Sequence, residues 1–268
     1  MVKFSIGTAG WDYKGWSGTF YPKNLEKINY LEFYAKYFNI IEINSSFYNL
    51  PSPKMVSNWV IRVPQNFRFI IKVWQEITHK LGIYEIKSSI KEFFQRFKPL
   101  EDKIVGFLFQ FPPRFNFSEN HRMELINLIN ELPQNKEIFY IIELRNNSWF
   151  YPEKLTEIID GNRIILATTY KPRILPYYLP NQQCYYIRLI GDRKLTYFGR
   201  IQREQQETLQ DLFGNIPILE KNPNIFEIFI IVNNHFQGFA PESANNIKKR
   251  LGIPFKSFNH QKSLTDYF

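Results

Sequence analysis

Two stretches near the middle of the chain decide its fold: IVGFLFQF (Ile104–Phe111) and IFYIIELR (Ile138–Arg145). Both are apolar at nearly every position and do not alternate with polar residues. A strand with one face in solvent alternates, whereas a strand covered on both faces is apolar throughout. These stretches therefore predict strands of a parallel sheet that is buried on both sides.

Six further runs of the same kind lie on both sides of this pair. The full set is Phe4–Gly10, Ile40–Phe47, Phe67–Trp74, Ile104–Phe111, Ile138–Arg145, Arg163–Tyr170, Cys184–Gly191 and Glu227–Asn234. Between residues 4 and 227 one run begins about every 32 residues, which is the size of one strand–helix–strand increment. Eight such units in roughly 250 residues are typical of a (β/α)8 barrel.

Stretches with helical spacing separate most of these runs. They are Leu25–Phe38, Tyr84–Phe97, Asn120–Leu132, Leu155–Ile159, Gln202–Phe213 and Ser243–Leu251. Ser118 is the expected N-cap of the third helix. In the sixth connection, Lys171–Pro180 contains three prolines and predicts only a short irregular helix or a loop.

An open doubly wound sheet is the alternative architecture. Its first turn would usually carry the GxGxxG phosphate motif, but this turn reads Gly7-Thr8-Ala9-Gly10-Trp11. The chain also lacks a linker or low-complexity tract. We therefore predict one α/β domain over residues 1–268, a single TIM-type barrel.

The composition narrows the class of protein. The 268 residues include 34 Lys or Arg and 25 Asp or Glu, a net charge of +9, and 44% are hydrophobic, which excludes disordered and collagen-like chains. The single cysteine, Cys184, excludes an intrachain disulfide and CxxC motifs. The chain lacks a signal-peptide pattern and an apolar run of about 20 residues, so we expect a soluble cytoplasmic protein without a membrane partner.

Seven segments in order resemble one known family. They are GTAGW (Gly7–Trp11), EINSSFY (Glu42–Tyr48), FRFIIKVWQEITH (Phe67–His79), GFLFQFPPRF (Gly106–Phe115), IELRNNSW (Ile142–Trp149), YIRLIGDR (Tyr186–Arg193) and VNNHFQGFAPESA (Val232–Ala244). Together they resemble the YecE-like family, domain of unknown function 72. This resemblance implies a TIM-type barrel and implies almost nothing about a reaction. Asn146 and Ile190 stand where the family commonly has histidines, so a role of those histidines would be absent or moved here.

Polar residues cluster where an active site would lie. In a TIM barrel, catalytic groups lie at the C-terminal ends of the strands and in the loops that follow. The predicted catalytic residues are Glu42, Lys72, Glu143, Arg145 and His79. The predicted substrate-binding residues are Trp11, Asp12, Tyr13, Trp16, Asn44, Tyr48, Gln110, Arg188, Arg193, Asn233, Asn234 and His235.

Each of these residues also has a structural interpretation. Charges on apolar strands need partners, because burying an unpaired charge costs several kcal/mol. Glu42, Glu143, Lys72, Arg145 and Arg188 could therefore neutralise one another inside the barrel. Trp16 could equally pack as part of a loop cover, and His79 and His235 could be structural.

The residue types at the strand ends exclude some reactions and permit others. Cys184 lies at the start of its strand, on the wrong side for a thiol mechanism. Lys72 is the one good Schiff-base lysine, although a pair with Glu42 or Glu143 would keep it charged. Glu42, His79 and Glu143 could also hold one or two Mg²⁺ or Mn²⁺ ions, and no organic cofactor is predicted.

The basic side chains favour an anionic ligand. Arginine and lysine bind phosphate or carboxylate, and exposed aromatic rings such as Trp11 and Trp16 stack on bases. We expect a phosphodiester hydrolase, nuclease-like and assisted by a divalent metal, that acts on single-stranded or damaged nucleic acid. Two alternatives stay open: a small-molecule enzyme or binding protein for a sugar phosphate or other organic anion, and a nucleic-acid-binding barrel without catalysis. The sequence leaves the oligomeric state open.

Overall fold

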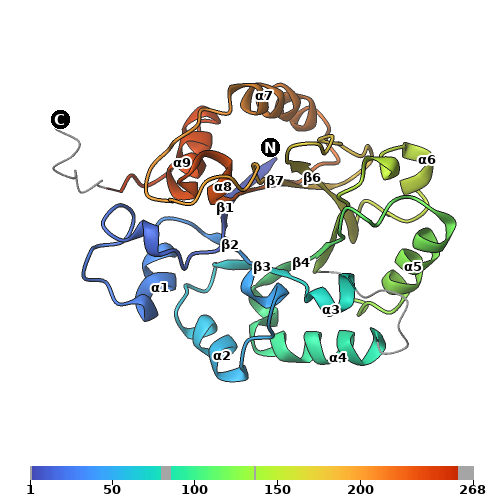
Figure 1. The fold of residues 1–268 in the computed structure, drawn as a ribbon, viewed down its shortest axis with the longest axis horizontal. Coiled ribbons are helices and arrows are strands. Elements are labelled where there is room, and N and C mark those ends of the chain that lie inside the picture. The colour runs from blue at the N-terminus through green and yellow to red at the C-terminus, as the bar shows by residue number, and fades with distance from the viewer. Residues whose placement is uncertain (1, 80–85, 136, 259–268) are drawn as a thin grey trace.

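Eight parallel strands close into a barrel in the order of the chain (Figure 1). The computed structural model describes residues 2–79, 86–135 and 137–258. The strands are β1 (Lys3–Ala9), β2 (Ile40–Ile43), β3 (Arg68–Lys72), β4 (Ile104–Gln110), β5 (Phe139–Glu143), β6 (Ile164–Tyr170), β7 (Cys184–Leu189) and β8 (Glu227–Val232). The prediction of a TIM-type barrel is therefore confirmed.

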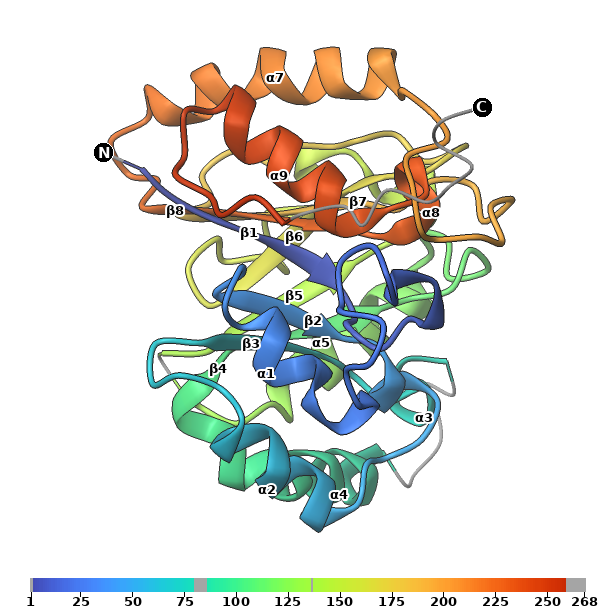
Figure 2. The same ribbon diagram turned by 90° about the vertical axis from the view of Figure 1, so that its left-hand side faces the viewer.

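Helices surround the barrel, with α7 and α9 on one side and α2 and α4 on the other (Figures 1 and 2). The α-helices are α1 (Tyr30–Tyr34), α2 (Pro53–Ile61), α3 (Gln75–Thr78), α4 (Ile86–Phe97), α5 (Glu119–Asn130), α6 (Pro152–Leu155), α7 (Gln206–Glu220), α8 (Asn234–Gln237) and α9 (Ala240–Arg250). Short 3-10 helices are η1 (Lys14–Trp16), η2 (Lys27–Asn29), η3 (Ser45–Phe47), η4 (Lys98–Lys103) and η5 (Asn147–Trp149). In the described part of the chain, no helix is long and apolar enough to span a membrane.

The predicted helices are mostly present, with shifted ends. The expected Ser118 cap of α5 is confirmed, because its hydroxyl accepts a hydrogen bond from the His121 amide. The first helix is shorter than predicted, α6 lies three residues earlier, and the predicted start at Tyr84 lies outside the described residues. Residues 171–183, all of them described, contain no helix, as the prolines there indicate.

Two helices differ from the sequence prediction for identifiable reasons. The helix α2 is absent from the sequence prediction, and Pro53 occupies its first turn, where its missing N–H costs nothing. The helix α7 continues past Phe213, where the predicted helix ends, and includes Gly214 and Pro217. Burial of Leu212, Ile216 and Leu219 on one stripe of α7 outweighs the two helix-breaking residues.

Two apolar layers hold the barrel together. A small cluster fills its interior and includes Ile40, Ile70, Leu108, Ile141 and Phe229. A larger cluster lies between the strands and the helices and contains most of the buried aromatic rings. Strands with both faces buried account for the runs of consecutive apolar residues in the sequence.

A charged plug closes the N-terminal end of the barrel. Arg68 donates to both oxygens of Glu227, over 2.9 and 2.6 Å, and the Ser5 hydroxyl donates to the same carboxylate. The Arg68 guanidinium also lies over the Phe229 ring, 5.3 Å from its centre. Because this end is filled and paired, the opposite end is the one open to a ligand.

Strand β1 approaches β2 so closely at Gly7 that no side chain fits there. A Cβ at this position would lie 2.3 Å from the carbonyl oxygen of Ile40. We expect Gly7→Ala to lower the free energy of unfolding by about 1–3 kcal/mol, because the strands must separate. The matched control is Gly214→Ala in α7, where a Cβ would meet nothing within 4 Å. We expect this substitution to stabilise the helix by about 0.5–1 kcal/mol. Urea denaturation measures both, and equal effects would contradict the close approach.

Candidate active site

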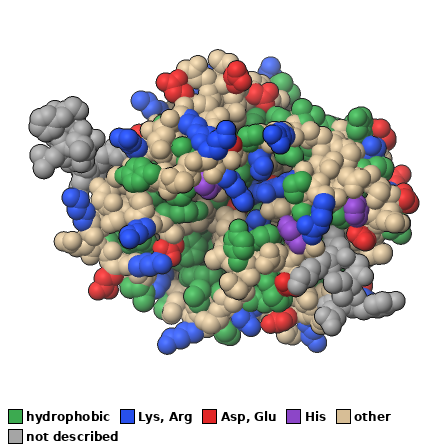
Figure 3. Space-filling view, viewed as in Figure 1, with side chains coloured by type: hydrophobic (Ala, Val, Ile, Leu, Met, Phe, Trp, Pro, Cys, Tyr) green, Lys and Arg blue, Asp and Glu red, His purple; other side chains and the backbone are tan. Residues whose placement is uncertain are grey.

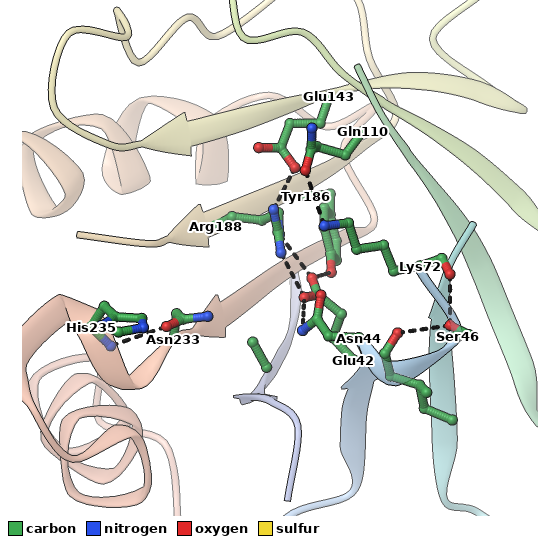
Figure 4. A network of polar contacts seen from close by, with 12 residues as sticks. Glu42, Asn44, Ser46, Lys72, Gln110, Glu143, Tyr186, Arg188, Asn233 and His235 are labelled. Carbon is green, nitrogen blue, oxygen red and sulfur yellow. Dashed lines mark hydrogen bonds and ion pairs between the residues drawn. The ribbon is translucent and has the colours of Figure 1, made fainter. Parts of the chain in front are cut away.

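One arginine joins two buried glutamates at the open end of the barrel (Figure 4). Arg188 of β7 donates from Nε and Nη2 to both oxygens of Glu42 on β2, over 2.8 and 2.6 Å. Its Nη1 donates to Glu143 of β5. All three side chains are at most 2% exposed. The guanidinium therefore links three strands that are not neighbours in the barrel.

Further donors complete the two carboxylates. Arg145 donates from Nε to Glu143 over 2.8 Å, while Tyr186 and Asn44 donate to Glu42. Burial alone would raise the pKa of Glu143, but Arg145, Arg188 and Lys72 together lower it to about 2. The oxygens of both carboxylates therefore accept hydrogen bonds, and the positive charges of the two arginines neutralise the negative charges of the two glutamates.

Lys72 is left outside this network. Its amine donates to the side-chain oxygen of Gln110 over 3.0 Å and lies 3.8 Å above the centre of the Phe47 ring. Among the described residues it forms no ion pair within 4.0 Å. Burial, followed by repulsion from Arg188, lowers the pKa of Lys72 to about 7. The structural interpretation in which Lys72 joins the charge network is therefore wrong, whereas the pairing of Glu42, Glu143, Arg145 and Arg188 is confirmed.

A cavity of about 290 Å³ opens above these groups at the C-terminal ends of the strands. Figure 3 looks onto this end of the barrel, where Lys and Arg side chains gather near the centre of the face. Ten of the predicted site residues line the cavity: Tyr13, Asn44, Tyr48, Lys72, Arg145, Arg188, Arg193, Asn233, Asn234 and His235. The glutamates lie beneath it with Gln110, so the arginines and the lysine face a ligand.

Asn234 lines this cavity, and its side chain is held by hydrogen bonds to other loops. Its side-chain oxygen accepts from the Trp16 indole over 3.1 Å and from the Ala240 amide over 3.0 Å, which fixes the orientation of the amide group. The side-chain nitrogen is buried and makes no hydrogen bond within the described chain, although it is close enough to Tyr13 to offset part of the rise that burial causes in the pKa of that phenol.

The loops after β7 and β8 touch through Gly191. This residue has φ of 74°, and a Cβ there would lie 2.1 Å from the carbonyl oxygen of His235. The His235 ring meets Phe198 edge-on at 4.9 Å, and burial, with Arg193 nearby, lowers its pKa. A glycine therefore sets how closely the two loops enclose the cavity.

Three of the predicted substrate-binding residues lie elsewhere. Trp16 is fully buried, so the prediction that it stacks on a ligand is wrong, and its interpretation as a packed loop cover is right. Trp11 and Asp12 line a separate, larger cavity next to the mouth. The structure thus divides the predicted aromatic loop into a packed part and a part that faces solvent.

His79 does not join the cavity. Its ring packs edge-on against Phe47 at 5.1 Å, and its Nδ1 lies 2.9 Å from the Thr78 hydroxyl. Burial, with Arg114 and Lys72 nearby, lowers the pKa of His79 to about 4. This histidine therefore packs beside the site and does not contact Glu42 or Glu143.

The three predicted metal ligands do not form a cluster. Across residues 2–79, 86–135 and 137–258, no group of three His, Cys, Asp or Glu side chains could hold a metal ion. Arg188 binds both Glu42 and Glu143, and His79 lies apart. The Mg²⁺ or Mn²⁺ site therefore stays a prediction, and no cluster of metal ligands among the described residues supports it.

Several site residues were missed from the sequence. Tyr186 lies two residues before Arg188 on β7 and donates to Glu42, so the two-residue period of a strand could have placed both inside the barrel. Phe47 and Phe198 carry no such signal, because an apolar residue near a strand end is usually core. Ile190, one of the two departures from the family pattern, lines the cavity, while Asn146, the other, caps η5.

The chain is similar to proteins of one family. A model of the family described as "Protein of unknown function DUF72" matches residues 5–266. The UPF0759 protein YunF of Bacillus subtilis (strain 168) is 24% identical over 278 residues, which cover 93% of this chain and 95% of YunF. The UPF0759 protein YecE of Escherichia coli (strain K12) is 30% identical over 145 residues, 54% of this chain and 49% of YecE.

A solved structure has the same fold. The crystal structure of a DUF72 family protein from Thermotoga maritima MSB8 superposes with a TM-score of 0.76 and 25% sequence identity. The match covers 93% of this chain and 99% of the other. A DUF72 family protein from Enterococcus faecalis V583 superposes with a TM-score of 0.73 and 24% identity, covering 95% and 99% of the two chains.

Removing Arg188 should destabilise the protein because two carboxylates lose their shared partner. We expect Arg188→Met to lower the free energy of unfolding by about 3–5 kcal/mol in urea denaturation. Adding Glu42→Gln should restore part of the loss. The matched control is Arg122→Met, because Arg122 also bridges two glutamates, Glu119 and Glu157, but at the surface. A similar loss in both variants would show that burial of the pair is unimportant.

Replacing Lys72 should change how stability depends on pH. The unfolded lysine keeps its proton until about pH 10.4, whereas the folded one loses it near pH 7. Between these values the unfolded state binds more protons, so the wild-type protein gains up to about 1.4 kcal/mol per pH unit from this group as pH rises. Lys72→Met lacks this gain.

The measurement is urea denaturation between pH 7.5 and 9.5. The stability of Lys72→Met relative to wild type should fall steadily as pH rises. Lys221→Met, at an exposed lysine, is the control and should track wild type. Parallel pH profiles for Lys72→Met and wild type would contradict a lowered pKa in the folded protein.

Proposed function

The chain belongs to the DUF72 family of proteins of unknown function, and from the site itself we propose that it is an enzyme for a small organic anion, a sugar phosphate or a carboxylate. The observation that carries this proposal is the amine of Lys72. It is buried, has only an amide and an aromatic ring as partners among the described residues, and faces a cavity between two arginines.

The charge at the cavity favours an anion. Glu42 and Glu143 are balanced by Arg145 and Arg188, so these four side chains carry no net charge. Arg193 also lines the cavity and its charge is surplus, and Lys72 adds a second positive charge when its amine is protonated. Cations and N–H donors converging on one cavity are the usual environment of a bound phosphate or carboxylate.

Lys72 supplies the chemistry in this proposal. A proton-transfer group works best when its pKa is near the operating pH, and the pKa of Lys72 is about 7. The ammonium form that a bound anion favours gives a proton to the substrate, and the neutral amine that results can take a proton back from another atom of it. Arg145 and Arg188 would hold the anionic group and stabilise negative charge that develops during the transfer.

The size of the cavity favours a small molecule. Its volume of about 290 Å³ is at the lower end of the range for ligand sites. That volume suits a phosphate or carboxylate with a few carbon atoms attached. A sugar phosphate or an organic acid therefore fits better than a long polymer lying wholly within the mouth.

Binding of an anion should be coupled to uptake of a proton. At pH 8 the Lys72 amine is mostly neutral, and an anion beside it would stabilise the ammonium form. We expect sulfate, a probe that does not itself titrate at this pH, to bind with uptake of up to about one proton. Titration calorimetry at pH 8 in two buffers of different ionisation enthalpy measures this number.

Two variants decide whether the proton goes to Lys72. Lys72→Met should bind sulfate without proton uptake. Lys248→Met is the matched control, because Lys248 is also buried and its pKa is lowered to about 8, but it lies over Phe38 away from the mouth. Equal proton uptake in wild type and Lys72→Met, or no binding of sulfate at all, would overturn the proposal. Thermal-shift screening of phosphorylated metabolites would then identify the natural ligand class.

A phosphodiester hydrolase acting on single-stranded or damaged nucleic acid is the second candidate. The net charge of +9 and the Trp11 ring beside the mouth favour it. Labelled single-stranded DNA and RNA, incubated with Mg²⁺, Mn²⁺ or a chelator, test this candidate and its metal together. Cleavage that Glu143→Gln and Lys72→Ala both abolish would support it, and no cleavage or binding under any condition would exclude it.

A further inference from the structure

We call the cavity lined by Lys72, Arg145 and Arg188 the anion site. A second cavity adjoins it at the mouth of the barrel. Its volume is about 640 Å³, and Tyr13 and Asn44 line both cavities. The loop after β1 forms one wall, and η2, α1 and α2 form the others. In Figure 3 a hollow lined by hydrophobic side chains lies beside the cluster of Lys and Arg side chains. A ligand held by its anionic group can therefore extend into this hollow.

The second cavity offers flat and apolar surfaces. Trp11 meets Trp59 edge-on, with ring centres 5.6 Å apart and an angle of 89° between the planes. Ile28 and Met55 line the same cavity, yet 58% and 48% of their surfaces are exposed. Large apolar side chains exposed together around a hollow mark a binding surface more often than chance.

Polar groups lie among these apolar ones. Asn58 and Arg62 of the α2 region line the cavity, and Asp12 forms an ion pair with Lys27 over 2.9 Å at its edge. Arg62 also donates to the side-chain oxygen of Asn29 over 3.2 Å, so the cavity wall combines apolar surfaces with polar groups that are held in place. A planar ring that stacks on an indole and has hydrogen-bonding atoms at its edge matches both kinds of surface.

We infer that the substrate is a nucleoside 5′-monophosphate, with its phosphate among Lys72, Arg145 and Arg188 and its base in the cavity of Trp11 and Trp59. This inference rests on the proposed function, because it takes the anion site as the place of the phosphate. The shared wall of Tyr13 and Asn44 is then the position of the ribose. The base supplies the specificity that the small anion cavity cannot provide.

Four probes separate the contributions of phosphate, sugar and base. They are inorganic phosphate, ribose 5-phosphate, adenosine and adenosine 5′-monophosphate, titrated into the full-length protein by calorimetry. We expect the nucleotide to bind at least about tenfold more tightly than ribose 5-phosphate, the order that stacking of one base on an aromatic side chain contributes. Adenosine alone should bind more weakly than the nucleotide.

Two variants test the second cavity. Trp11→Leu removes the ring, and Met55→Ala shortens an exposed side chain whose backbone amide, not its side chain, bonds to Ser52. Both should bring the affinity ratio of nucleotide to ribose 5-phosphate closer to one. Phe226→Leu is the control, because that ring is 50% exposed and precedes β8 at the closed end of the barrel. It should keep the wild-type ratio.

The outcomes distinguish this inference from the proposed function. If ribose 5-phosphate and the nucleotide bind equally well, the assignment of the base is wrong while the anion site stands. The same holds if both variants keep the wild-type ratio. If no phosphorylated probe binds, the anion site itself is wrong and the inference fails with it.

Discussion

The contact of Arg188 with two buried glutamates is the constraint on which the site depends. A buried carboxylate must find a cation or give up its charge, and Arg188 satisfies Glu42 and Glu143 from a third strand. Because the arginine occupies both carboxylates, Lys72 has no acidic partner among the described residues, and burial together with repulsion from Arg188 lowers its pKa toward neutrality. The ion pairs that satisfy the two glutamates therefore leave one buried amine outside the charge network.

The strands could be predicted from the sequence because burial on both faces leaves a local trace. Every residue of Ile40–Ile43 is buried, and three of these four residues are isoleucine. The sequence alone therefore indicates a strand that is covered on both faces. Helix ends depend on packing and were predicted less well. Gly214 and Pro217 indicate the end of α7 locally, but the buried stripe through Ile216 continues the helix to Glu220. Whether burial outweighs the local helix preference at such a position cannot be predicted from the sequence alone.

The site was predicted as a set of positions and not as a set of contacts. Strand ends are readable from the sequence, so most residues of the cavity could be named in advance. Partner choice is not readable, because Arg188 reaches strands far away in the chain. Trp16 shows the same limit, since its indole donates to Asn234, 218 residues away, and its ring packs against Phe239 from the same distant part of the chain. The orientation of the Asn234 amide follows from this bond and could be known only from the structure.

The contact at Gly191 makes the two loops at the mouth a single mechanical unit. Since backbone touches backbone there, neither the segment of Arg193 nor that of Asn234 and His235 can shift alone. The absence of a side chain at Gly191 thus determines the shape of the anion cavity as much as the side chains that line it. For protein engineering, substitutions elsewhere in these loops would tune which groups meet the ligand, whereas any substitution at position 191 would change the separation of the loops and with it every contact at once.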